Sequence, residues 1–280
     1  MLRYDAAWLI EQYRDEIPAA AGLPYTRIGD AGPYRVVCHE GLFELDDVLE
    51  LTPQVDYDEL VARLIAIDGT TLHVQPAPYV SGVKSNYAMD GPGELRSLFR
   101  AEYGSKLPPL TDRRLSNGIG TVVVVCDRAG RPYLPRRARG QSVFPGGWHC
   151  TASGETVWEG ACGFDELFLK QVCQELEEEV GLRRGDLDWI RPVAFCREFL
   201  RAVKPQFFFA ASTSLSPQEL AERRRAAIAI QIARGRQEIE DEVLDEVTPE
   251  SLKLCTLECI AALTLALSAG ELPRVFDDRT

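Results

Sequence analysis

The chain has 280 residues and a formal net charge of −12; 45% of its residues are hydrophobic and 26% are charged. This balance is that of a globular protein and excludes an intrinsically disordered chain. The acidic charge argues against a general nucleic-acid binder, because an acidic surface repels phosphate backbones. A nucleotide substrate is still compatible with it, since a bound divalent cation reverses the local field.

The cysteines and histidines indicate the compartment and argue against a zinc site. There are eight cysteines, none in a C-x-x-C pair, and most lie within apolar runs. We therefore expect buried, reduced thiols in a cytoplasmic protein. Three histidines are too few for a zinc site built on imidazole. The longest apolar stretch, Cys259–Ala269, is too short to cross a bilayer, so no membrane partner is expected.

The first part of the chain, residues 1–112, predicts a small mixed α/β domain. Helical periodicity covers Tyr4–Glu16, Asp56–Ile67 and Glu94–Gly104, and strands are expected near Tyr34–His39 and Thr70–Pro76. Pro108, Pro109 and the polar residues after them interrupt the pattern and mark the boundary. Two roles are open for this domain: a cover over a substrate, or the interface of a homodimer.

Residues 113–280 predict strands alternating with helices. In chain order we expect a buried strand at Ile119–Cys126, a returning strand at Pro132–Arg137, a Gly-Gly loop, a short strand at Trp148–Ala152, a helix at Phe164–Val180, strands at Trp189–Phe199 and Gln206–Thr213, a helix from Ser216 to about Arg234, a strand near Ile239–Leu244, and a last helix opened by Thr248. Gly181 stands where a left-handed residue ends a helix, and Ser216 opens a capping box.

The helix that ends before Gly181 carries a cluster of three glutamates that is a candidate metal site. Glu175, Glu178 and Glu179 stand at i, i+3 and i+4, opposite the apolar face. Their charges repel one another, and the C-terminal end of a helix disfavours anions. A hard divalent cation would remove both penalties, since Mg²⁺ prefers carboxylate oxygens, water and phosphates. On spacing within the helix alone, a solvated acidic face is the simpler interpretation.

The residues around these glutamates resemble the Nudix signature G-x5-E-x7-R-E-U-x-E-E-x-G-U, in which U is a bulky aliphatic residue. The matching positions are Gly160, Glu166, Glu175, Leu176, Glu178, Glu179, Gly181 and Leu182. Gln174 departs from the pattern, because the family has arginine there. Family members often place the first glycine in a Pro-Gly-Gly turn, so Gly147 is the alternative to Gly160.

The resemblance covers about residues 115–280 and implies a Nudix-type α/β/α sandwich with a mixed sheet, preceded by the small α/β domain. It also implies that Glu175, Glu178 and Glu179 hold Mg²⁺ or Mn²⁺ and are catalytic. The implied activity is hydrolysis of a diphosphate linkage in a nucleoside-diphosphate-linked compound, by water attack at phosphorus. The general base is either a signature glutamate or a member of the acidic run Glu238, Glu240, Asp241 and Glu242.

The departure at Gln174 bears on activity. Glutamine can donate a hydrogen bond to Glu166 or Glu175, but a neutral donor is weaker than arginine. We expect reduced or specialised activity. The alternative from another class is a nucleotide-sugar sensor or regulatory protein that has the same fold and no turnover.

The substrate is less well indicated. A looser resemblance points to the UDP-sugar-cleaving Nudix hydrolases, which also have an N-terminal domain and an extended segment between the Gly-Gly turn and the helix; an ADP-ribose-like compound is the other possibility. Arg136, Arg137 and Arg197 are the candidate phosphate or sugar contacts. Trp148-His149-Cys150 superficially resembles isopentenyl diphosphate isomerase, whose further histidines are absent.

Overall fold

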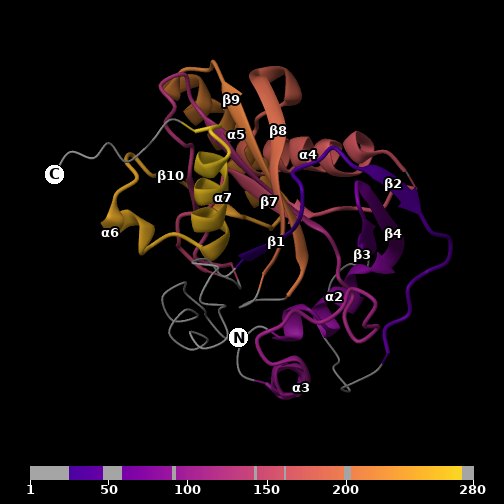
Figure 1. The fold of residues 1–280 in the computed structure, drawn as a ribbon. Coiled ribbons are helices and arrows are strands. Elements are labelled where there is room, and N and C mark those ends of the chain that lie inside the picture. The colour runs from indigo at the N-terminus through magenta and orange to yellow at the C-terminus, as the bar shows by residue number, and fades with distance from the viewer. Residues whose placement is uncertain are drawn as a thin grey trace.

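The computed structural model describes residues 25–46, 59–89, 93–141, 144–160, 162–198 and 203–272. At its centre is a five-stranded mixed sheet with the strand order β1-β8-β9-β5-β7 (Figure 1). Its strands are β1 (Tyr25–Gly29), β5 (Gly120–Cys126), β7 (Ala152–Glu155), β8 (Leu187–Glu198) and β9 (Pro205–Thr213). β5 and β9 run parallel, and the other neighbours are antiparallel.

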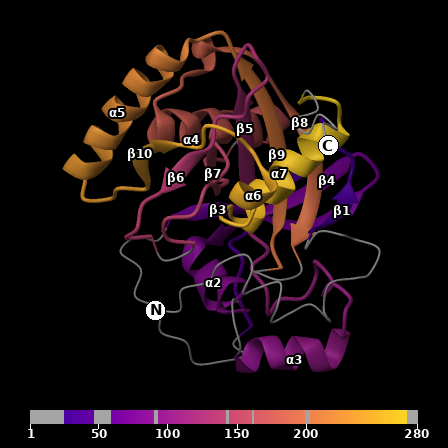
Figure 2. The same ribbon diagram turned by 90° about the vertical axis from the view of Figure 1, so that its left-hand side faces the viewer.

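Helices cover both faces of this sheet. α4 (Lys170–Val180) and α5 (Pro217–Ala233) lie together on one face, and α7 (Leu257–Ser268) lies on the other (Figures 1 and 2). Along β5, Val123 and Val125 belong to the core under α4, whereas Val122 and Val124 belong to the core under α7. Because successive side chains of a strand point to opposite faces, a strand covered on both sides is apolar throughout. The predicted α/β class is thus confirmed.

A second sheet and a helical segment come before β5 in the chain. The sheet has the order β2-β4-β3, with β2 (Arg35–Cys38), β3 (Leu60–Asp68) and β4 (Thr71–Pro78). α2 (Tyr79–Lys84), a 3₁₀ turn and α3 (Glu94–Tyr103) follow it. The prediction of a helix at Asp56–Ile67 is wrong, because residues 60–68 form β3 and pair with β4. A short apolar run fits either period, and here strand pairing decides.

The position of β1 bears on the predicted domain boundary. β1 precedes residue 112 in the chain, yet it pairs with β8 in the central sheet, with Tyr25 opposite Glu198. The division at 112 stays a prediction. The helix expected at Tyr4–Glu16 lies outside the described residues.

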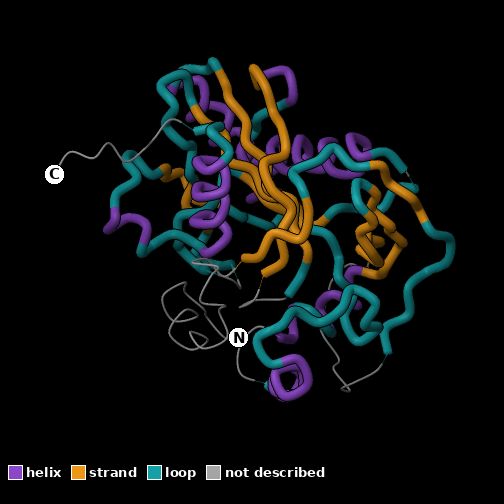
Figure 3. Tube along the Cα trace, in the orientation of Figure 1, coloured by secondary structure: helices purple, strands orange, loops and turns teal. Residues whose placement is uncertain are grey.

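The remaining elements come in the expected order but differ in their bounds and pairing. Figure 3 shows the observed helices, strands and loops. The chain returns along the end of β5 as predicted, with an antiparallel bridge between Cys126 and Pro132 and a hydrogen bond from the Tyr133 N–H to the Val125 carbonyl. The regular strand that follows, β6 (Pro135–Arg137), pairs with β10 (Ile239–Val243) instead. The strand expected at Trp148–Ala152 begins only at Ala152, as β7. The last helix is two helices: α6 (Pro249–Leu252) opens at Thr248, and α7 opens at its own N-cap, Thr256.

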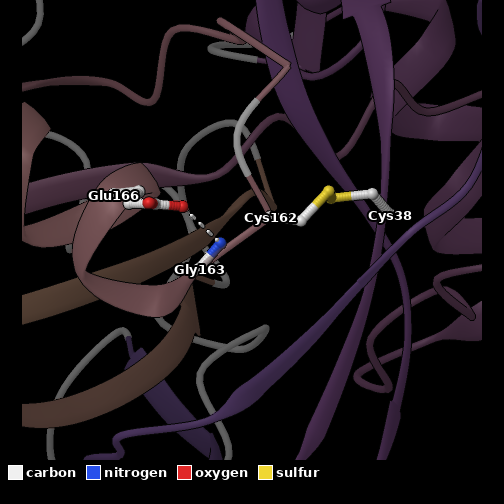
Figure 4. The surroundings of a disulfide bond; sticks show 4 residues. All are labelled: Cys38, Cys162, Gly163 and Glu166. Atoms are coloured by element: carbon white, nitrogen blue, oxygen red, sulfur yellow. Dashed lines mark hydrogen bonds between the residues drawn. A yellow bond between two sulfur atoms is a disulfide. The ribbon is translucent and has the colours of Figure 1, made fainter.

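A disulfide joins Cys38, at the end of β2, to Cys162, just before the helical segment that leads into α4 (Figure 4). The expectation that all cysteines are reduced is wrong for this pair, which is 124 residues apart in sequence and is brought together only by the tertiary fold. Cys126, Cys150, Cys196, Cys255 and Cys259 are free and buried, as predicted. Within the described ranges, no helix is long and apolar enough to cross a membrane.

Candidate functional site

The candidate site lies on α4, which is positioned by its buried face and by its C-terminal cap. One π-helical turn, Asp165–Leu169, leads into α4, and Val172, Leu176 and Val180 bury its inner face. Gly181 ends the helix with φ 74°, in the left-handed region. A Cβ at Gly181 would lie 2.5 Å from the Arg223 carbonyl oxygen on α5. Glycine is therefore required here by conformation and by close packing.

The three predicted glutamates differ in their surroundings. Glu179 is 4% exposed, and its Oε1 accepts a hydrogen bond from the backbone N–H of Ser153 at 2.8 Å. Glu175 is half-buried and accepts one from Gln171 Nε2 at 2.7 Å. Glu178 is exposed. The fold thus buries Glu179, covers Glu175 in part and leaves Glu178 at the surface.

Gly154, in β7, makes room for Glu175. A Cβ at this position would lie 1.9 Å from Glu175 Oε1 and 2.2 Å from its carboxyl carbon. Any other residue would displace the carboxylate. Gly154 is not among the residues predicted from the sequence. A glycine inside a short strand often marks a close approach of another group, and that is the signal that could have indicated it.

The buried carboxyl groups hold their protons more tightly than free ones. Burial raises the pKa of Glu175 to about 8, and the nearby charges of Glu238, Glu178 and Glu155 add to this effect. Burial also raises the pKa of Glu179 well above its ordinary range, and Glu238 and Glu175 raise it further. The Ser153 N–H and the Arg137 charge act in the opposite direction on Glu179. The site is therefore a poorly solvated group of acids, in which Glu175 and Glu179 favour the protonated form when no cation is bound.

Of the four acidic residues before and within β10, one lies near the glutamates of α4 and three interact elsewhere. Glu238 acts electrostatically on both Glu175 and Glu179, and partial burial raises its own pKa against the charges of Arg137 and Arg236. The other three have partners of their own. Asp241 pairs with Arg224 and Arg225, Glu242 pairs with Arg136, and Glu240 accepts from the Arg139 N–H.

The three arginines that were predicted to contact the substrate lie in different surroundings. Arg137, on β6, lies within electrostatic range of Glu179 and Glu238. Arg136 donates to the Gly146 carbonyl at 2.9 Å and pairs with Glu242 at 2.6 Å. The structure does not bring Arg197 to the site: it is 3% exposed, and its guanidinium donates to the Val203 and Pro108 carbonyls. Burial lowers the pKa of Arg197 to about 10.

The supporting residues of the signature lie mostly at the surface. Gly160 is exposed in a loop with φ 80°, whereas the carbonyl of Gly147 accepts the backbone N–H of Arg137 at 2.9 Å. Glu166 is exposed and accepts from the Gly163 N–H at 3.2 Å (Figure 4). In the structure, Gln171 rather than Gln174 donates to Glu175, and Glu166 accepts from Gly163. Gln174 itself is exposed.

The donor set is compatible with magnesium, although it is not a complete cage. Among the described residues, no three His, Cys, Asp or Glu side chains are grouped so that they could hold a metal ion. Mg²⁺, however, is commonly held by one or two carboxylates together with waters and substrate phosphates. Glu175 and Glu179 supply two such carboxylates, and a bound cation would relieve their desolvation.

Comparison with known proteins gives little. No protein-family model and no curated protein matches the chain. Among solved structures, the crystal structure of DR0079 from Deinococcus radiodurans is similar over 44% of this chain and 77% of that one, at 17% identity and a TM-score of 0.30. A similarity this low carries no argument about fold or function.

Proposed function

We propose that the chain is a Nudix-type hydrolase that uses Mg²⁺ or Mn²⁺ to cleave a diphosphate linkage in a nucleoside-diphosphate-linked compound. The observation that carries the proposal is the pair of desolvated carboxyls on α4, Glu175 and Glu179. Burial favours the protonated form of both groups, and a divalent cation held by them would stabilise their carboxylate forms instead, so the pair is suited to hold an ion. The mixed sheet between helices, with α4 on one face, is consistent with a Nudix-type sandwich.

In this proposal the residues have distinct roles. Glu175 and Glu179 would hold the ion, with Glu178 as a third carboxylate ligand. When bound, the ion supplies positive charge that stabilises the diphosphate oxygens and orients the attacking water. Glu238 takes the proton from that water, because its raised pKa makes it a better base than an ordinary glutamate. Arg137 contacts a phosphate through a charge-assisted hydrogen bond.

The proposed substrate is a UDP-sugar or an ADP-ribose-like compound. The same site without turnover would make a nucleotide-sugar sensor. The observation that favours this second function is the exposed Gln174, which leaves the neutral amide of Gln171 as the donor to Glu175.

A turnover assay decides between the two functions. The purified protein is incubated with Mg²⁺ or Mn²⁺ and UDP-glucose, ADP-ribose, NADH, diadenosine polyphosphates, coenzyme A or nucleoside triphosphates, and phosphate is measured after phosphatase treatment. The expected result is cleavage of one class, abolished by a chelator and by Glu179→Gln. Glu177→Gln is the matched control, since Glu177 lies on the same helix but is exposed and paired with Arg183. Equal loss in both variants, or full turnover in Glu179→Gln, would refute the assignment. Ligand-induced thermal stabilisation without turnover would support the sensor.

A further inference from the structure

His149 lies in the interior, beneath the candidate site, and both of its ring nitrogens are engaged. The residue is 1% exposed. Its Nδ1 is 2.7 Å from Thr256 Oγ1, the N-cap of α7, and its Nε2 is 2.9 Å from Ser153 Oγ in β7. The imidazole therefore links the start of α7 to β7.

Ser153 carries this link to the α4 glutamates. Its hydroxyl contacts His149, and its backbone N–H donates to Glu179 Oε1 at 2.8 Å. Among the hydrogen bonds of the described residues, this N–H is the donor to the Glu179 carboxylate. The position of the Ser153 N–H thus sets the position of that carboxylate. Pairing with Val122 of β5 holds the Ser153 backbone, and His149 adds a contact to its hydroxyl.

The neighbouring groups favour one of the two neutral tautomers of the ring. Thr256 Oγ1 already accepts the Cys259 N–H at 3.1 Å, so its own hydroxyl proton is available to donate to Nδ1. Nε2 then carries the hydrogen and donates to Ser153. The Glu258 carboxylate, 3.7 Å from Nε2, favours a proton on that side.

We propose that His149 is a positioning residue: as the Nε2–H tautomer it fixes Ser153, and through the Ser153 N–H it holds Glu179 in place for the metal. This inference rests on the proposed function, because it concerns the same carboxylate. Partners that orient metal ligands from behind commonly change metal affinity or activity by about 10–100-fold when removed.

The test measures Mn²⁺ binding directly, from the electron paramagnetic resonance signal of free Mn²⁺ during titration, and measures kcat and KM separately. His149→Leu removes both hydrogen bonds and should weaken Mn²⁺ binding or lower kcat by about 10–100-fold. His149→Gln retains a donor near the Nε2 position and should recover most of that loss. Ser153→Ala, which keeps the backbone N–H, should give a smaller loss and serves as the second variant if His149→Leu does not fold.

Cys196→Ala is the matched control, because Cys196 is buried in the core cluster under α7 and its change removes packing alone. A loss of binding in Cys196→Ala as large as that in His149→Leu would overturn the inference, as would unchanged Mn²⁺ affinity and kcat in His149→Leu. The ¹⁵N spectrum of the three histidines should show His149, identified by its absence in the variant, as the Nε2–H tautomer. The other tautomer would also overturn the inference. If the wild-type protein neither binds Mn²⁺ nor turns over, the proposed function itself fails.

Discussion

Replacing Glu175 with glutamine should stabilise the folded protein at pH 8 and leave it little changed at pH 5. Burial raises the pKa of Glu175 from its ordinary value of 4.5 to about 8. Between these values the folded state binds a proton that the unfolded state has lost. Stability therefore falls as the pH rises through this window, because stability decreases with pH wherever the native state binds more protons.

The size of the effect follows from the shift. One pKa unit corresponds to 1.36 kcal/mol, so the wild-type chain should lose on the order of 3 kcal/mol from this group between pH 5 and pH 8. Glutamine has the same shape and no charge, and its Oε1 can still accept from Gln171. Glu175→Gln should thus be more stable than the wild type at pH 8 by about that amount.

The assay is urea denaturation of both proteins at several pH values in the presence of a chelator. Glu179 and Glu238 titrate in the same direction, so the informative quantity is the difference between the two proteins rather than either slope. Mn²⁺ should restore much of the wild-type stability at pH 8 and restore little in Glu175→Gln. Parallel pH curves for the two proteins would refute the reasoning, because they would mean that the carboxyl is well solvated in the folded state.

Three further predictions follow from the contacts. Gly154→Ala should weaken Mn²⁺ binding by at least roughly tenfold in a titration, since the new Cβ would lie 1.9 Å from Glu175 Oε1; normal binding would contradict the close approach. Changing Cys38 and Cys162 to serine should lower the free energy of unfolding by about 2–4 kcal/mol without reductant and have no effect with dithiothreitol, where the wild type is reduced as well. Arg197→Leu should cost about 1–3 kcal/mol in urea denaturation by leaving buried carbonyls unpaired, while KM stays unchanged; a raised KM with normal stability would return Arg197 to the substrate site.

Much of the secondary structure could be predicted from local sequence patterns, because caps and periodicity depend only on residues that are close in the chain. The apolar spacing of α4, the left-handed cap at Gly181 and the capping box at Ser216 all appear in the structure where the sequence predicts them. The continuous apolar run of β5 likewise indicated a strand covered on both faces. Caps and periodicity are interactions of near neighbours, so the chain itself specifies them.

Tertiary structure decided what depends on partners far away in sequence. Residues 60–68 have an ambiguous pattern, and pairing with β4 makes them a strand. The Cys38–Cys162 disulfide and the enclosed Arg197 have no local sign either, and a glycine at position 154 does not by itself indicate which group approaches it. The spacing of the glutamates indicated one acidic cluster, yet packing against β7 leaves Glu179 buried, Glu175 half-buried and Glu178 exposed. Burial sets their pKa values, and burial is a property of the folded chain.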